Sequence, residues 1–297
     1  MKTNMNRRDF LKASGFAATA TAILPATLNT AAAAAGKKRA IKKAIMWGTI
    51  GFKGSVLEKM RAVKAAGFEG VEPNGGMDRN EVKEALDATG LKAASVCCHT
   101  HWAKPLSDPN PAAREVGLEG LKLSLQDAKH YGATSVLLVP GVVNDNVTYD
   151  QCFERSIVEI RKAIPVAAEL GVKIAIENVW NNFITKPEQA VRYLQEINSP
   201  HVGWHFDIGN IIRYGLPEEW IPALGNHILK LHIKEFGQAK RFSVKLLEGD
   251  NHWPAIMKAL DAVGYDGWGI SEQPGDQAKD AESLKDLSDR MSRIFAM

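Results

Sequence analysis

The sequence predicts an α/β protein, a single-domain (β/α)8 TIM barrel, on three observations. Strand-like and helix-like segments alternate almost without interruption along residues 40–297, a pattern that favours parallel strands joined by helical crossovers. Four of the strand-like runs end in a carboxylate or an imidazole, and active-site residues of such barrels lie at the C-terminal ends of the strands. Without an N-terminal leader of 35 residues the chain has 297 − 35 = 262 residues, close to the roughly 250 of one barrel.

The first 35 residues are predicted to form a twin-arginine signal peptide. The signature runs from Asn6 to Lys12 around Arg7-Arg8, and a small, apolar stretch and an alanine-rich cleavage site follow it. The stretch from Ala13 to Leu24 is short beside the roughly 20 strongly apolar residues of a spanning helix, so we expect no stable membrane anchor. An uncleaved anchor is the alternative. We expect periplasmic or other export by the twin-arginine translocation machinery, which carries folded proteins with their cofactors.

The charge balance excludes a nucleic-acid partner. The chain has 37 Lys+Arg and 34 Asp+Glu, of which the leader holds four and one, so 37 − 4 = 33 and 34 − 1 = 33 remain. A formally neutral chain lacks the broad basic face of nucleic-acid proteins. Cys97, Cys98 and Cys152 are an odd set and are expected to be buried thiols. A bond from Cys152 to one of the other two is the alternative.

The first half of the barrel is predicted from four strand–helix units. The strands are Ala44–Trp47, Gly70–Glu72, Lys92–Cys98 and Ser135–Val139. The helices are Val56–Ala66, Asn80–Thr89, Pro111–Tyr131 and Tyr149–Leu170. Each helix is followed by a glycine, at positions 67, 90, 132 and 171, and glycine is the usual residue just beyond a helix C-terminus.

The second half repeats the pattern. Its strands are Lys173–Glu177, Val202–Asp207, Ile228–His232 and Trp268–Glu272, and its helices are Lys186–Ile197, Pro217–Ala223, Trp253–Val263 and Ala281–Ile294. Eight units close naturally into a barrel. An open doubly wound sheet is the alternative, but no G-x-G-x-x-G follows the first strand. Because no linker follows residue 43, one domain over residues 40–297 is predicted.

Four residues at the ends of the last four strands are candidate metal ligands. They are Glu177, Asp207, His232 and Glu272. Each alone could cap a helix or lie in the core, but strand ends meet on one rim of a barrel, and together they favour one site. Three carboxylates and an imidazole make an oxygen-rich donor set, which indicates one divalent metal, Mn²⁺ first, with Mg²⁺, Co²⁺ or Zn²⁺ as alternatives.

Further residues near strand ends are candidates for substrate binding. For each of them a solvated, capping or core role is the alternative. His205 is expected to fill the barrel, and Trp102 could join an apolar wall against a sugar face. The candidates are Trp47, Glu72, His99, His101, Trp180, Asn210 and Lys234.

Several motifs in the second half of the chain carry a family resemblance. They are Ile176-Glu177-Asn178, Phe206-Asp207-Ile208-Gly209-Asn210, Leu231-His232-Ile233-Lys234-Glu235, Leu247-Glu248-Gly249-Asp250, and Gly264-Tyr265-Asp266-Gly267-Trp268 leading to Ser271-Glu272. With them the chain resembles the xylose-isomerase-like superfamily of sugar isomerases and epimerases, which includes hydroxypyruvate isomerase and D-tagatose 3-epimerase. The resemblance implies that Glu177, Asp207, His232 and Glu272 bind one divalent metal. It also implies that Glu177 and Glu272 are the acid/base pair.

The expected function is a metal-dependent isomerase or epimerase of an unphosphorylated sugar or keto-sugar. A carboxylate removes a proton next to a carbonyl, a metal-stabilised enediolate forms, and the proton is returned. Two positions depart from the family pattern, because Asn210 replaces a frequent histidine and Phe183 replaces a glutamate of the sugar 3-epimerases.

Three alternatives remain beside that function. The same proton removal would let a lyase or deglycosidase act on 3-keto-glycosides. A sugar-binding barrel without catalysis is the alternative of another class. A relative of the abasic-site endonucleases would need more histidine ligands and a DNA-binding surface, which the neutral chain does not indicate. A homo-oligomer is compatible with all of these readings.

Overall fold

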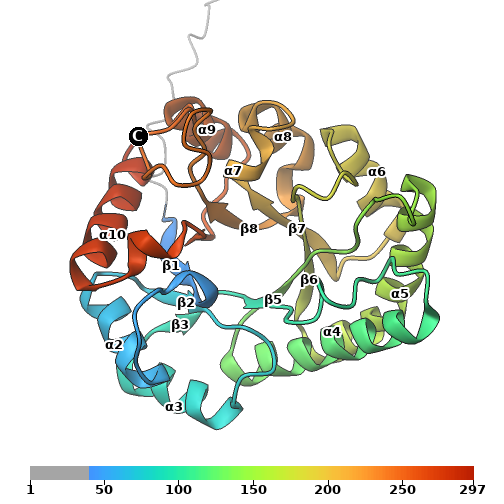
Figure 1. Cartoon of the computed structure of the whole chain (residues 1–297), viewed down its shortest axis with the longest axis horizontal. Helices are drawn as coiled ribbons and strands as arrows, with labels where there is room; N and C mark the ends of the chain where they lie inside the picture. Colours follow the sequence, from blue (N-terminus) through green and yellow to red (C-terminus); the bar gives the residue numbers. More distant parts are fainter. Residues whose placement is uncertain (1–39) are drawn as a thin grey trace, which may run out of the picture. The chain divides into compact units, whose positions relative to one another are not determined.

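The computed structural model describes residues 40–297, which form a ring of parallel strands inside an outer ring of helices (Figure 1). The predicted signal peptide lies outside the described residues. The strands are β1 (Lys42–Met46), β2 (Gly70–Glu72), β3 (Lys92–Ala93), β4 (Val96–Cys97), β5 (Ser135–Leu138), β6 (Lys173–Glu177), β7 (Val202–Asp207), β8 (Ile228–Ile233) and β9 (Trp268–Ser271).

The strand order confirms the barrel. It runs β3-β2-β1-β9-β8-β7-β6-β5-β4, and every pair is parallel. β3 and β4 are the two halves of the predicted strand Lys92–Cys98, which is interrupted at Ala94 and Ser95. Because β3 pairs with β2 and β4 pairs with β5, this broken strand closes the ring. The open doubly wound sheet is therefore wrong.

The helices begin and end within one residue of their predicted bounds. Three of them end at a left-handed glycine, Gly90, Gly132 or Gly171, at φ of 68°, 77° and 66°, a conformation that costs other residues steric strain. The larger helices are α2 (Val56–Ala65), α3 (Arg79–Thr89), α4 (Pro111–Tyr131), α5 (Tyr149–Leu170), α6 (Pro187–Ile197), α8 (Pro217–Leu224), α9 (Trp253–Ala262) and α10 (Ala281–Phe295).

Four short helical turns were not predicted. They are η1 (Trp47–Thr49), α7 (Ile208–Ile211), η2 (Gly225–His227) and η3 (Gly275–Ala278). The first of them corrects the predicted strand Ala44–Trp47, because β1 ends at Met46 and the chain turns at Trp47.

Successive side chains along each strand point alternately outward, into the apolar core under the helices, and inward, toward the barrel axis. In β7, Trp204 and Phe206 belong to the apolar layer under the helices, and Phe206 packs on Trp220 of α8 at 6.5 Å between ring centroids. His205 and Asp207 therefore face the axis. A smaller apolar cluster of Ala44, Ala94 and Ile270 fills part of the interior. The barrel thus directs alternate residues of each strand toward one axial site.

The three cysteines all lie in the described part of the chain. Cys97, Cys98 and Cys152 are free and buried, as expected. Within residues 40–297 no helix has the length and apolar character that crossing a membrane requires.

Candidate functional site

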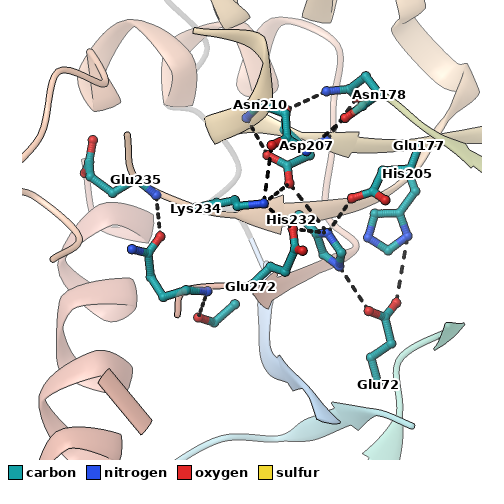
Figure 2. Close-up of polar contacts among 12 residues, drawn as sticks. Glu72, Glu177, Asn178, His205, Asp207, Asn210, His232, Lys234, Glu235 and Glu272 are labelled. Atoms are coloured by element: carbon teal, nitrogen blue, oxygen red, sulfur yellow. Dashed lines mark hydrogen bonds and ion pairs between the residues drawn. The ribbon is translucent and has the colours of Figure 1, made fainter. Parts of the chain in front are cut away.

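The four strand-end residues converge on one point at the rim of the barrel. Glu177 ends β6, Asp207 ends β7, His232 lies in β8, and Glu272 follows β9. One ligand atom from each lies within 4.8 Å of the others. Figure 2 shows their side chains pointing toward one another, with Nδ1 of His232 at 2.9 Å from Oε1 of Glu177, 3.1 Å from Oε2 of Glu272 and 3.8 Å from Oδ2 of Asp207.

Burial and mutual charge set the electrostatics of this cluster. Burial raises the pKa of Glu177 to about 8 and also raises that of Asp207. Burial opposes the ionisation of Glu272 as well, but Lys234 and His232 hold its pKa well below its ordinary value. Burial disfavours the imidazolium of His232, yet Glu272 and Glu72 raise its pKa well above the ordinary value. The site is therefore a buried concentration of acids that attracts cations.

The donor set fits a divalent cation. Lys234 is a positive side chain in contact with the cluster, with Nζ 2.8 Å from Oε2 of Glu272 and 3.3 Å from Oδ2 of Asp207. With the three carboxylates ionised and His232 neutral, as metal binding requires, one lysine cannot balance the charge, and uncompensated buried charge is costly. Carboxylate oxygens with an imidazole nitrogen are a donor set that Mn²⁺ and related ions accept.

A short motif fixes Asp207 in place. Its Oδ1 accepts a hydrogen bond from the backbone N–H of Asn210 at 2.7 Å, which caps the turn α7. Its own N–H and C=O bond the side chain of Asn178 at 3.1 and 2.7 Å. Gly209 is needed here, because a Cβ would lie 2.8 Å from the backbone oxygen of Lys234. The turn Asp207-Ile208-Gly209-Asn210, which carries the candidate ligand Asp207, can therefore pack closely against the chain at Lys234, directly after β8.

A cavity of about 210 Å³ opens beside the cluster, and Glu177 and Glu272 line it. Three aromatic side chains, Trp102, Trp180 and Phe242, form part of its other walls, beside the aliphatic side chains of Met46, Leu137 and Val179. The indole of Trp180 is held by a 2.8 Å bond from Nε1 to the backbone oxygen of Asn210, and its ring lies 4.9 Å from that of Phe242. Such a cavity presents carboxylates at one end and ring faces along its sides.

His101 offers a neutral hydrogen-bond donor to the cavity. Its Nδ1 accepts a bond from the backbone N–H of Val139 at 3.2 Å, so the proton of the neutral ring lies on Nε2. Burial lowers the pKa of His101 to about 4, which keeps the ring neutral at physiological pH. The side chain can therefore donate to a ligand oxygen without adding charge.

The predicted substrate-binding residues fall into two groups. His101, Trp180, Asn210 and Lys234 line the cavity, and so does Trp102. The other three are absent from its lining among the described residues, and each lies elsewhere: Glu72 is fully buried behind His232, His99 is exposed against Gly76, and Trp47 packs under Lys59. His205 is buried inside the barrel, as expected.

Sequence reasoning missed two features of the site. Phe242 lies in the segment between β8 and α9, where no periodicity marked it, although an aromatic residue in a long loop was a usable signal. Glu235 anchors that segment, because its carboxylate accepts bonds from the backbone N–H groups of Leu247 and Asn251 and from Nε1 of Trp253, at 2.7 to 3.0 Å. In the sequence, the only sign of this role of Glu235 was its position directly after His232-Ile233-Lys234.

Phe183, one of the two departures from the family pattern, does not line the cavity. It is buried in an aromatic cluster with Tyr149 and Tyr193, at 5.4 and 5.3 Å between ring centroids. The other departure, Asn210, does line it, and its Oδ1 accepts a 3.3 Å bond from Nζ of Lys234. Of the two positions, only Asn210 can therefore touch a ligand directly.

Comparison with known proteins adds relatives of known and unknown activity. The chain is 26% identical to the uncharacterized protein MJ1311 of Methanocaldococcus jannaschii, over 61% of this chain and 67% of that one. It is 23% identical to L-ribulose-5-phosphate 3-epimerase of Salmonella paratyphi A, over 71% of this chain and 79% of the relative. These similarities are distant but extend over most of both chains.

Solved structures share the fold. Apo 3-keto-D-glucoside 4-epimerase from E. coli superposes with a TM-score of 0.71 at 18% identity, covering 86% of this chain and 100% of that one. D-psicose 3-epimerase in the presence of D-fructose gives 0.73 at 15% identity, covering 85% and 98%. The family model "Xylose isomerase-like TIM barrel" matches residues 60–294. The chain belongs to the xylose isomerase-like TIM barrel family.

Proposed function

We propose that the protein is a metal-dependent epimerase or isomerase of sugars or keto-sugars. One observation carries the proposal: Glu177 and Glu272 line the same cavity, and each has a carboxylate oxygen within about 3 Å of Nδ1 of His232. Two carboxylates that reach one substrate provide a proton acceptor and a proton donor. A distant relative is named as a 3-epimerase of L-ribulose-5-phosphate, which supports the reaction class but not the unphosphorylated substrate.

Glu177, Asp207, His232 and Glu272 would hold one divalent metal, with Mn²⁺ as the first choice. When bound, such an ion polarises a carbonyl and stabilises the negative charge that forms on its oxygen. Asp207 serves only as a ligand in this proposal, because it is fully buried and outside the cavity lining. Glu177 and Glu272 have both roles.

Glu177 and Glu272 approach the cavity from different sides of the barrel rim. Glu177 ends β6 and Glu272 follows β9, and β7 and β8 lie between these strands in the sheet. Removal of a proton by one glutamate and return by the other, on the opposite face, inverts a carbon and gives epimerisation. One glutamate that shuttles a proton between adjacent carbons gives isomerisation. An enediolate lies between reactant and product in both cases.

The cavity lining supports an unphosphorylated substrate. Among the described residues that line it there is no arginine, and its lysine, Lys234, is already engaged with Asp207 and Glu272. A phosphate group would need charged partners that this lining does not offer. His101 and the aromatic walls suit hydroxyl groups and the apolar face of a sugar ring instead.

Export fits the same substrate class. We propose that residues 1–35 direct the folded, metal-loaded barrel of residues 40–297 to the twin-arginine machinery. Sugar phosphates are mainly cytoplasmic, so an exported enzyme meets free sugars and glycosides. Cell fractionation tests this placement. The processed chain should be found in the periplasmic fraction, and the double variant Arg7→Lys, Arg8→Lys should stay in the cytoplasm.

A lyase acting on 3-keto-glycosides is the second candidate. It is favoured by Trp102, whose side chain is 56% exposed beside the cavity and offers an aglycone a stacking surface. A structural neighbour is named for a 3-keto-glucoside. Proton removal next to the keto group would then expel the aglycone at the adjacent position. An inactive sugar-binding barrel is less well supported, because both glutamates are present.

Solvent exchange tests the proposal. The Mn²⁺-loaded protein is incubated in D₂O with unphosphorylated ketoses and 3-keto-glycosides, and deuterium uptake is followed by NMR. Glu177→Gln and Glu272→Gln should each lower the exchange rate by about 10²- to 10⁴-fold. Glu159→Gln is the control, since Glu159 is a buried carboxylate of α5 that pairs with Arg114 of α4 and Lys162 of α5.

Each outcome separates the candidates. A new epimer or isomer with deuterium at one carbon supports the proposal, whereas release of a free aglycone supports the lyase. No uptake by any sugar with metal bound would overturn both. A Glu272→Gln variant at the wild-type rate would remove that residue from the acid/base pair.

A further inference from the structure

The imidazole of His232 lies between two acidic groups. Its Nδ1 faces Glu177, Asp207 and Glu272, while its Nε2 lies 3.0 Å from Oε2 of Glu72. Figure 2 shows Glu72 approaching the ring from the side opposite Asp207. Glu72 and His232 are both 0% exposed. The ring is therefore held from both sides inside the barrel.

Only one of its two sides can supply a lone pair to a metal. A neutral imidazole has one acceptor nitrogen and one N–H donor. When Nδ1, which faces the three cavity-side carboxylates, binds a metal, Nε2 must carry the proton and can donate a hydrogen bond to Glu72. Glu72, His205 and His232 are close enough to resemble a second metal site, but they could form one only at the expense of the first.

We infer that Glu72 is a positioning residue, which orients the metal ligand His232 by accepting the hydrogen bond from Nε2. This inference rests on the proposed metal site. Metal-binding histidines commonly donate their second N–H to a carboxylate, which fixes the tautomer and the ring plane. Because Glu72 is absent from the cavity lining and fully buried, it does not bind substrate directly.

The barrel explains how a residue of β2 reaches β8. β2 is three residues long, and Val71 belongs to the apolar layer under the helices, so Glu72 faces the axis. Two strands, β1 and β9, lie between β2 and β8 in the sheet. The contact therefore crosses the barrel interior and depends on the curvature of the sheet between β2 and β8.

His205 supports this pair from the side. Its ring is 4.1 Å from that of His232 between centroids, at 64° between the planes, and it is 0% exposed. Its Nδ1 lies 3.9 Å from Oε1 of Glu72, and neither atom has a hydrogen-bond partner among the described residues. An approach of about 0.7 Å would bring the two atoms to hydrogen-bonding distance. His205 thus limits how far Glu72 and His232 can rotate.

Metal affinity tests the inference directly. Mn²⁺ binding is measured by calorimetry on the wild type and on Glu72→Leu, Glu72→Gln and Glu159→Gln. Loss of the carboxylate in Glu72→Leu should weaken binding by about 10- to 100-fold. Glu72→Gln retains an acceptor oxygen and should lose less, and Glu159→Gln should match the wild type.

A spectroscopic signal separates positioning from a general structural effect. With ¹⁵N-histidine and diamagnetic Mg²⁺ or Zn²⁺ bound, the Nε2 proton of His232 should show the downfield shift of a bond to a carboxylate. Glu72→Gln should move this resonance upfield, while the histidines other than His205, which lies against Glu72, keep theirs. This nearly isosteric variant carries the test if Glu72→Leu fails to fold.

The failures are distinguishable. A wild-type protein that binds no divalent metal overturns the proposed metal site and this inference with it. If the wild type binds metal, either of two results overturns the inference alone. One is a Glu72→Leu variant with the metal affinity of the wild type, and the other is a Glu72→Gln variant with an unchanged Nε2 proton resonance. Graded weakening from Gln to Leu with a shifted proton supports it.

Discussion

Replacement of Lys234 by methionine should destabilise the metal-free protein strongly and the metal-bound protein much less. Nζ of Lys234 lies 2.8 Å from Oε2 of Glu272 and 3.3 Å from Oδ2 of Asp207, and the lysine is only 9% exposed. Methionine keeps a similar length and removes the charge. Asp207 and Glu272 then have no lysine to balance their buried charge, and a bound metal would supply the missing positive charge.

The size of the effect follows from the burial of the broken pair. Loss of one partner from a buried ion pair typically costs about 3–5 kcal/mol in the free energy of unfolding. For a domain of this size about 2–4 °C of melting temperature corresponds to 1 kcal/mol, so Lys234→Met should melt roughly 6–20 °C lower in EDTA. A divalent ion at 100 times its Kd adds about 2.7 kcal/mol to a protein that binds it. Tighter binding by the variant would recover more.

Lys230 provides a matched control on the same strand. It is 5% exposed and two residues before His232, but among residues 40–297 its Nζ hydrogen-bonds the hydroxyl of Thr134, at 2.9 Å, rather than a carboxylate. Burial lowers the pKa of Lys230 to about 8, so at pH 7 the charged form is held against a desolvation cost. Lys230→Met should therefore be neutral or stabilising, with little dependence on metal.

Thermal unfolding followed by circular dichroism, in EDTA and in Mn²⁺, measures both variants. The reasoning predicts a large loss for Lys234→Met in EDTA, a larger metal-induced gain for it than for the wild type, and neither effect for Lys230→Met. Equal losses for the two variants in EDTA would refute it. So would a Lys234→Met loss that metal leaves unchanged.

Three further predictions concern other parts of the molecule. Phe183→Glu should destabilise the protein by several kcal/mol in urea unfolding, because it buries a charge among aromatic rings, and wild-type stability would contradict this. Trp180→Ala should raise KM by roughly tenfold or more through loss of a cavity wall, and an unchanged KM would exclude stacking. Burial raises the pKa of Cys152 from 9.0 to about 12. Its thiol should therefore be alkylated about 1000-fold more slowly in the native protein than after unfolding near pH 8, and the native rate should rise about tenfold per pH unit. A fast reaction of the native protein would disprove the burial of Cys152.

Much of the fold could be predicted because its signals are local. Glycine stops, apolar periodicity and short apolar strands are properties of a few consecutive residues. The break at Ala94 and Ser95 was not predictable in this way. The sequence of a continuous apolar strand that pairs with both neighbours does not differ from that of a broken strand whose first half pairs with one neighbour and whose second half pairs with the other.

The site was predicted where it depends on strand ends and missed where it depends on closure. Glu177 and Asp207 were identified because each ends an apolar strand. The location of Glu72 behind His232 requires a contact across the ring, which no local pattern encodes. His99 and His101 looked equivalent at two residues apart, but the chain leaves the strand after Cys97, so alternation no longer applies and only His101 turns inward.

The distribution of the site along the chain has a consequence for how such an enzyme could change. All four candidate ligands come from β6 to β9, whereas Met46, Cys97, His101 and Trp102 bring the first half of the barrel to the cavity wall. The candidate ligands thus come from the second half alone, whereas the cavity wall combines these first-half residues with Trp180 and Phe242 of the second half. For the proposed epimerase or isomerase, substitutions among these first-half residues would reshape the cavity and leave Glu177 and Glu272 unchanged, so a new specificity need not pass through an inactive ancestor.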